Sequence, residues 1–282
     1  MRQFRRLRIY FFFLIVFLSQ MYSQDFLRVM SFNIRYDNPN DGKNIWDNRK
    51  DQMIEMLNCY QPDFIGLQEA LINQLSYITN GLQNYSYIGV GREDGKEKGE
   101  FSPILFDTSK FELIRQKTFW LSETDDIVSV GWDAALERIC TYGLFKERRT
   151  EELFHVFNTH FDHMGDTARL MSAKLIMKKI DKFTNDSSKI ILMGDFNCEL
   201  DSEPISIIKN ELDYGADVSL KRLYGPDGTF NGFNESIIIT ERIDFIFIKN
   251  LQVLTYRHID DRTKNNNFIS DHLPVIVEVK FE

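Results

Sequence analysis

The chain has 282 residues and a formal net charge of −8 at pH 7. This acidic balance argues against tight non-specific DNA binding, which depends on Lys and Arg contacts to phosphates. The three cysteines, Cys59, Cys140 and Cys198, are odd in number and far apart, so they form neither a zinc-binding spacing nor a disulfide framework. We therefore expect buried free thiols and a fold that is stabilised by its hydrophobic core.

The N-terminus has the pattern of a secretory signal peptide, which we place at residues 1–23. Four arginines precede an uncharged run at 9–18, and small residues follow near Ser23. The run is shorter than the ~20 apolar residues of a spanning helix, and an uncleaved signal-anchor is the alternative. Cleavage would remove the four arginines and leave an exported chain, periplasmic or secreted, with a net charge of −12 and no stable membrane anchor.

Residues 24–282 have a length that fits one large α/β domain or two small ones, and we assign them to one domain. Residues 27–34 and 63–67 read as buried strands that bring Asn33 and Glu69 to their ends. Helical spacing of apolar residues is found at 47–60 and 73–80. Further strands are expected at 85–90, 101–106 and 111–121, and as a pair at 141–145 and 153–158.

In the second half of the chain, the residue pattern predicts a helix at 167–183, a buried strand at 190–193 and a helix at 204–212. Residues 132–140 are ambiguous and 213–233 are loop-like. The last strands are expected at 242–248, 251–257 and 275–281. Because strands outnumber helices and several adjoin through short turns, we expect antiparallel pairing within an α/β body rather than a purely parallel sheet.

The stretch Gly194-Asp195-Phe196-Asn197 follows one buried strand directly. Asp195 and Asn197 are two residues apart, so in strand geometry they point to the same side. Ligands of α/β sheets bind at this carboxyl edge, and a carboxylate beside an amide suits a hard cation and a phosphate oxygen. An ordinary loop turn is the alternative for this tetrapeptide alone.

Other apolar runs also end in Asn, Glu, His or Asp rather than in the Lys, Ser and Thr expected of ordinary strand edges. Solvation of a strand end would explain any one of these positions, but it explains the shared preference poorly. The set is Asn33, Glu69, Glu100, His160, Asp195, Asn197, Asp244, Asp271 and His272.

The chain resembles the endonuclease/exonuclease/phosphatase superfamily, in the form of a deoxyribonuclease-like phosphoesterase of the secreted bacterial type. The resemblance covers residues 26–282 and implies a four-layer α/β/β/α sandwich with two mixed sheets face to face. It rests on motifs in the family's order: Ser31-Phe32-Asn33, Leu67-Gln68-Glu69, Asn158-Thr159-His160, Gly194-Asp195-Phe196-Asn197, Arg242-Ile243-Asp244 and Ser270-Asp271-His272-Leu273-Pro274.

The resemblance implies hydrolysis of phosphate esters with Mg²⁺ or Mn²⁺. Glu69 is then the principal metal carboxylate, and Asn33 and Asp271 complete its surroundings. The resemblance further implies in-line attack by water, with no covalent enzyme intermediate. In that reaction Asp195 aligns or deprotonates the water, Asn197 holds a phosphate oxygen, and an Asp244–His272 pair contacts the scissile phosphate.

Two more assignments follow from the resemblance, and a third follows from the residues themselves. His160 and Glu100 match a pair that assists the leaving group, although Glu100 could equally be a loop carboxylate. Arg138 matches an arginine that contacts phosphate, or else forms a surface salt bridge. Trp46, Phe230 and Phe233 could shape a pocket, or pack in the interior.

The sequence thus predicts an exported, monomeric, metal-dependent phosphoesterase that acts on a phosphodiester or a phosphomonoester. A secreted DNA or RNA nuclease is the alternative among enzymes. A catalytically silent binding module on the same scaffold is the alternative outside enzymes, and the intact set of acidic and histidine residues argues against it.

Overall fold

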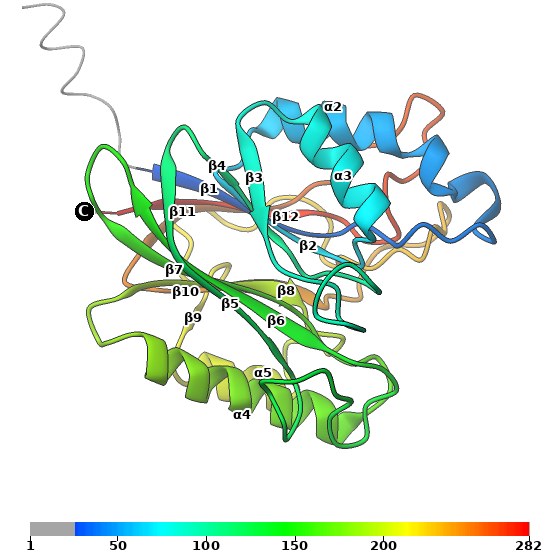
Figure 1. Ribbon diagram of the computed structural model, residues 1–282. Helices are drawn as coiled ribbons and strands as arrows, with labels where there is room; N and C mark the ends of the chain where they lie inside the picture. Colours follow the sequence, from blue (N-terminus) through cyan, green and yellow to red (C-terminus); the bar gives the residue numbers. More distant parts are fainter. Residues whose placement is uncertain (1–25, 282) are drawn as a thin grey trace, which may run out of the picture.

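The computed structural model describes residues 26–281, so the predicted signal peptide lies outside the described residues. Two six-stranded sheets pack face to face, with helices α2 and α3 outside one sheet and α4 and α5 outside the other (Figure 1). The predicted four-layer sandwich with two mixed sheets is confirmed.

The first sheet has the order β11-β12-β1-β2-β4-β3. Its central strands β1 and β2 are parallel, and every other neighbouring pair in it is antiparallel. The strands are β1 (Phe26–Asn33), β2 (Phe64–Gln68), β3 (Tyr85–Ile88), β4 (Ile104–Asp107), β11 (Gln252–His258) and β12 (Val275–Lys280).

The second sheet has the order β5-β6-β7-β8-β10-β9 and repeats this pattern, because only its central pair β7–β8 is parallel. The expected antiparallel pairing within an α/β body is therefore present in both sheets. The strands are β5 (Phe111–Trp120), β6 (Ile139–Glu147), β7 (Leu153–His160), β8 (Lys189–Asp195), β9 (Asp213–Tyr214) and β10 (Asp244–Lys249).

Apolar side chains fill the space between the sheets and the space under the helices. The inner cluster joins residues of both sheets, including Val277 of β12 and Phe157 of β7, and extends to α4. A second cluster packs α2 (Lys50–Tyr60) and α3 (Ile72–Gly81) on the first sheet. The remaining helices are α4 (Asp166–Phe183), α5 (Glu203–Lys209) and the 3₁₀ turns η1 (Gly42–Asn44) and η2 (Trp46–Asn48).

The structure corrects several local predictions. The helix predicted from residue 47 begins at Lys50, after a separate 3₁₀ turn, and the predicted loop at 213–233 contains the short strand β9. All three cysteines are free, but Cys59 is exposed because it lies on the outer side of α2, whereas Cys140 is buried. No helix among the described residues has the length and hydropathy to cross a membrane.

Candidate active site

The site lies at the ends of the two central parallel strand pairs, β1–β2 and β7–β8. Asn33 ends β1, and Glu69 directly follows β2. In the other sheet, His160 and Asp195 end β7 and β8 and are paired in register. The strands β7 and β8 run close together here. A Cβ atom on Gly194 would lie only 2.3 Å from the carbonyl oxygen of Thr159. Side chains far apart in the sequence thus meet at one rim.

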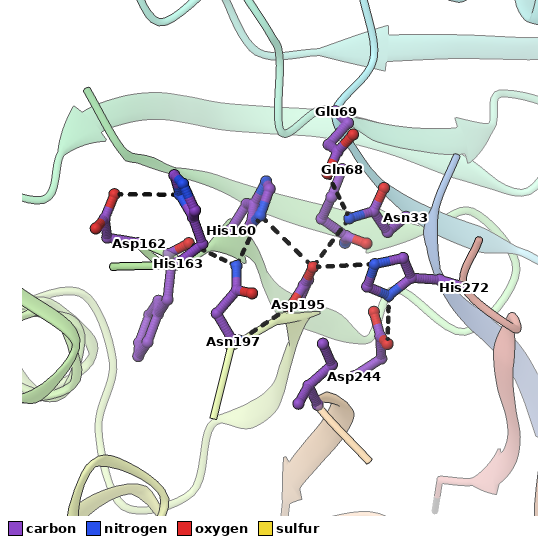
Figure 2. Close-up of polar contacts among 12 residues, drawn as sticks. Asn33, Gln68, Glu69, His160, Asp162, His163, Asp195, Asn197, Asp244 and His272 are labelled. Carbon is purple, nitrogen blue, oxygen red and sulfur yellow. Dashed lines mark hydrogen bonds and ion pairs between the residues drawn. The ribbon is translucent and has the colours of Figure 1, made fainter. Parts of the chain in front are cut away.

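Asp195 is the centre of this cluster (Figure 2). Its Oδ2 accepts a hydrogen bond from Asn33 Nδ2 at 2.9 Å, and its Oδ1 accepts one from the Asn197 backbone N–H at 2.9 Å. The Nε2 atoms of His160 and His272 lie 3.5 and 3.8 Å from the same Oδ2. Burial, and then the charge of Asp244, raises the pKa of Asp195 to about 7.

Asp244 and His272 form the predicted pair. His272 Nδ1 lies 2.9 Å from Asp244 Oδ2, and both residues are buried. Burial disfavours the charged ring, but the carboxylates of Asp244 and Asp195 outweigh it and raise the pKa of His272 well above its ordinary value. The Asp244 backbone N–H donates to Thr229 Oγ1 at 3.2 Å, which fixes the start of β10. The pair therefore presents a charged imidazolium to the rim.

His160 is the other imidazole at this rim, and it is neutral. Burial, and then the nearby guanidinium of Arg138, holds the pKa of His160 well below its ordinary value. Asn197 Nδ2 lies 3.0 Å from His160 Nε2 and 3.0 Å from the Phe161 carbonyl oxygen, so it donates to both. His160 Nδ1 lies 4.0 Å from Glu100 Oε2. The two imidazoles are therefore differently charged.

Glu100 has a partner that the sequence did not indicate. Arg92 donates to both carboxylate oxygens of Glu100, at 2.8 and 2.9 Å, across the loop that separates the two residues. Burial raises the pKa of Glu100 in spite of this pair. The contact with Arg92 is much closer than the 4.0 Å separation from His160, so Glu100 is first of all the partner of this arginine.

Glu69 and Asp271 form the acidic side of the site. Glu69 Oε1 accepts from Asn33 Nδ2 at 3.1 Å, and its Oε2 accepts from the Tyr36 N–H at 3.1 Å. Arg35 lies beside both carboxylates, with Nη1 4.0 Å from Glu69 Oε2 and Nε 3.8 Å from Asp271 Oδ2. Burial raises the pKa of Asp271. Sequence reasoning missed Arg35, although it stands two residues after Asn33.

The donors on this side fit a hard cation. Asn33, Glu69 and Asp271 offer amide and carboxylate oxygens, the ligands that Mg²⁺ prefers. Asp195, Asp244 and His272 also place one ligand atom each within 4.8 Å of one another. A protonated imidazole has no lone pair for a metal, however, and the raised pKa of His272 disfavours that second set. Asn33, Glu69 and Asp271 therefore remain the predicted metal ligands.

Arg138 lies on the opposite flank and is buried, so it does not form the surface salt bridge of the alternative reading. Its Nε donates to Asp162 Oδ1 at 3.2 Å and its Nη2 lies 2.9 Å from His163 Nδ1, while Nη1 is buried without a partner among the described residues. Burial opposes the charge of Asp162, but backbone N–H donors such as that of Gly165, together with Arg138, hold its pKa at about 2.

Of the three aromatic residues singled out in the sequence, only Phe230 contacts a residue of the cluster around Asp195. Its ring meets that of His272 edge to face at 5.0 Å. Trp46 is buried against Tyr77, and Phe233 packs on a small cluster that contains Phe268. Trp46 and Phe233 are packing residues, as the alternative reading held.

A fold with two mixed sheets between helices, and an acid-, amide- and histidine-lined rim, defines the class of metal-assisted phosphoesterases and nucleases that the sequence motifs indicated. The endonuclease/exonuclease/phosphatase family pattern matches residues 30–272. The chain belongs to this family.

Solved structures with the same fold include two from Bacteroides thetaiotaomicron. One is an endonuclease/exonuclease/phosphatase family protein, 36% identical with a TM-score of 0.88, and the match covers 93% of this chain and 100% of that one. The other is a mannosyl-6-phosphatase, 37% identical with a TM-score of 0.86, over 90% of this chain and 100% of that one. Protein L388 of Acanthamoeba polyphaga mimivirus is 28% identical over 249 residues, 82% of this chain and 91% of its own length.

Proposed function

We propose that the protein is a divalent-metal-dependent phosphomonoesterase that acts on a phosphorylated sugar. The observation that carries the proposal is the cluster around Asp195, in which a carboxyl group with a pKa of about 7 faces a charged imidazole 3.8 Å away. The similarity over nearly the whole chain to a mannosyl-6-phosphatase supports the choice of a sugar phosphate.

In this proposal Asp195 is the general base. Its pKa near 7 suits a group that must take a proton from water at neutral pH and release it again. His272, held by Asp244, places positive charge where the transferred phosphoryl group gains negative charge. Both amide hydrogens of Asn197 are already donated within the chain, so Asn197 reaches a phosphate oxygen only by exchanging its bond to His160.

Neutral His160 and the adjacent Arg138 serve the leaving group in this proposal. Arg138 acts on this group through its charge in this proposal, because its Nη1, which has no partner among the described residues, is buried. Glu100, which is paired with Arg92, then acts on His160 through charge at 4.0 Å rather than through a hydrogen bond.

Asn33, Glu69 and Asp271 hold Mg²⁺ or Mn²⁺ in this proposal. When bound, the ion neutralises charge on the leaving oxygen. Glu69→Gln removes a carboxylate charge but keeps the shape and the acceptor for Asn33, so we expect it to raise the metal concentration needed for half-maximal binding by at least ~10-fold. Isothermal titration of Mn²⁺ into the metal-free protein measures this, and an unchanged midpoint would remove Glu69 from the ligand set.

The substrate class is tested with the mature chain, residues 24–282. Mannose 6-phosphate, p-nitrophenyl phosphate, bis(p-nitrophenyl) phosphate and plasmid DNA are each incubated with Mg²⁺ or with EDTA. We expect metal-dependent release of phosphate from the two monoesters and slower turnover of the diester. Plasmid nicking far above ester turnover would establish the nuclease alternative, and no metal-dependent turnover of any substrate would establish the binding module.

We further propose that the protein is exported and monomeric. The composition of residues 1–23 supports export. Expression of the full chain in a bacterial host, with N-terminal sequencing of the periplasmic fraction, is expected to show cleavage near Ser23. Retention of the intact N-terminus in the membrane fraction would instead establish the signal-anchor alternative.

A further inference from the structure

Arg35 occupies a fixed position beside the acidic side of the site. It stands two residues after the end of β1 and has a left-handed backbone conformation, with φ of 55°. Asp41 holds its guanidinium in a two-point contact, Nε to Oδ2 at 2.9 Å and Nη2 to Oδ1 at 3.0 Å. Asn38 in turn donates to Asp41 Oδ1 at 2.8 Å. The loop after β1 therefore fixes the orientation of the guanidinium group.

The guanidinium retains N–H groups that have no hydrogen-bond acceptor among residues 26–281. Of its five N–H groups, the contact with Asp41 uses two. Its Nη1 lies 4.0 Å from Glu69 Oε2, and its Nε lies 3.8 Å from Asp271 Oδ2, both beyond hydrogen-bond distance. The side chain is 25% exposed, so a solute can reach it.

The charge of a phosphomonoester creates a need for such a donor. A monoester dianion has three terminal oxygens, whereas a diester has two and carries one negative charge. The site is rich in carboxylates, since Glu69 and Asp271 lie beside Arg35, and Asp195 and Asp244 lie beside His272. An imidazolium and a bound cation supply positive charge near the phosphate, and a further fixed cation beside them would have the third oxygen of a monoester as its acceptor.

We propose that Arg35 determines specificity for phosphomonoesters, because its Nη1 binds the third terminal oxygen, which a diester lacks. Asp41 orients the group through Nε and Nη2, and this contact leaves Nη1 without a hydrogen bond to Asp41. This inference rests on the proposed function, because it assumes that the phosphate binds between His272 and the acidic side.

Arg35→Met tests the inference, with Arg262→Met as a matched control. Arg262 has a similar two-point contact with Asp260 and is 23% exposed, but it lies over Phe268. At saturating Mg²⁺, Arg35→Met is expected to lower kcat/KM for p-nitrophenyl phosphate on the order of 10²-fold, the size of one charge-assisted hydrogen bond. For bis(p-nitrophenyl) phosphate, the loss in kcat/KM is expected to stay below ~3-fold. Arg262→Met is expected to leave kcat/KM for both esters unchanged.

Binding gives a readout that needs no turnover. Inorganic phosphate and dimethyl phosphate are titrated into the Mg²⁺-loaded wild-type and variant proteins by calorimetry. We expect Arg35→Met to weaken the binding of inorganic phosphate by at least ~10-fold, and Arg35→Lys to weaken it less, because it keeps the charge but loses the fork. Dimethyl phosphate should bind all three proteins alike.

The outcomes separate the two proposals. Suppose that wild-type protein hydrolyses the monoester and that Arg35→Met lowers kcat/KM equally for the monoester and the diester. Arg35 then has a structural role, and only the present inference is wrong. If wild-type protein hydrolyses no monoester but Arg35→Met still weakens phosphate binding, the proposed function is wrong and Arg35 remains a ligand for the dianion. Unchanged phosphate binding in Arg35→Met would overturn the inference in either case.

Discussion

At the scale of single residues, Asp195 and His272 carry the greatest share of the proposed chemistry. We expect Asp195→Ala and His272→Ala each to lower kcat by at least ~10³-fold, because each removes a positioned base or charge from the phosphoryl group. Phosphate release from p-nitrophenyl phosphate measures the loss, and far-ultraviolet circular dichroism checks that the fold persists. Wild-type-like turnover in either folded variant would contradict the role assigned to that residue.

Two histidines outside the site predict how stability depends on pH. Burial lowers the pKa of His155 and of His258 to about 4, whereas an unfolded histidine titrates near 6.5. Between these values the unfolded chain binds more protons than the folded one, so these histidines lower the free energy of unfolding as pH falls from 6.5 to 4. The raised pKa of Asp195 acts in the opposite direction over the same range.

The contribution of His258 is isolated by comparing variants. Asn in place of His258 keeps a donor for the Pro226 carbonyl, which lies 2.8 Å from His258 Nδ1, but does not titrate. We expect the difference in unfolding free energy between wild type and His258→Asn to shrink as pH is lowered from 7 to 4.5, as measured by urea denaturation. A difference that is constant with pH would show that His258 is not kept neutral by the fold.

At the scale of elements, one buried arginine connects the segments that carry the proposed metal ligands. Arg49 is 1% exposed, and Nη1 donates to the carbonyl oxygens of Ile34 and Ile269 at 2.8 and 2.9 Å. Its Nε donates to the Asn44 carbonyl at 2.6 Å. Asn33 and Asp271 lie within two residues of the first two carbonyls, so Arg49 sets the spacing of β1 and the 270–272 segment.

Arg49→Met is therefore expected to affect both stability and metal binding. It leaves several buried carbonyl oxygens without donors, which we expect to lower the free energy of unfolding by roughly 3 kcal/mol. We also expect the midpoint of a Mn²⁺ titration to move to a higher Mn²⁺ concentration, because Arg49 no longer connects the segments that carry the proposed ligands. Arg148→Met is the control, since the exposed side chain of Arg148 donates to one carbonyl oxygen, that of Thr108. Equal effects of the two variants on urea unfolding would contradict the assigned role of Arg49.

At the scale of the whole molecule, the elements that could be predicted from the sequence are those whose formation depends on local residue patterns. Strands such as β1 and β8 are apolar runs that end in polar residues, and their ends could be recognised without knowing their neighbours. The two-residue strand β9 could not be recognised, because it exists only through its pairing with β10. The partners of Arg35 and Arg92 were missed for a similar reason: they depend on how two loops fold back toward the rim.

The shared core predicts that both sheets unfold together. One cluster of apolar side chains includes residues from both inner faces, so neither sheet keeps its core without the other. Trp46 belongs to the cluster that packs α2 and α3 on the first sheet, and Trp120 ends β5 of the second, so each reports on one half. Variants that keep only Trp46 or only Trp120, with Phe at the other tryptophan positions, are unfolded in urea and followed by fluorescence. We expect coincident midpoints, whereas midpoints that differ by more than ~0.5 M would show two separately folding halves.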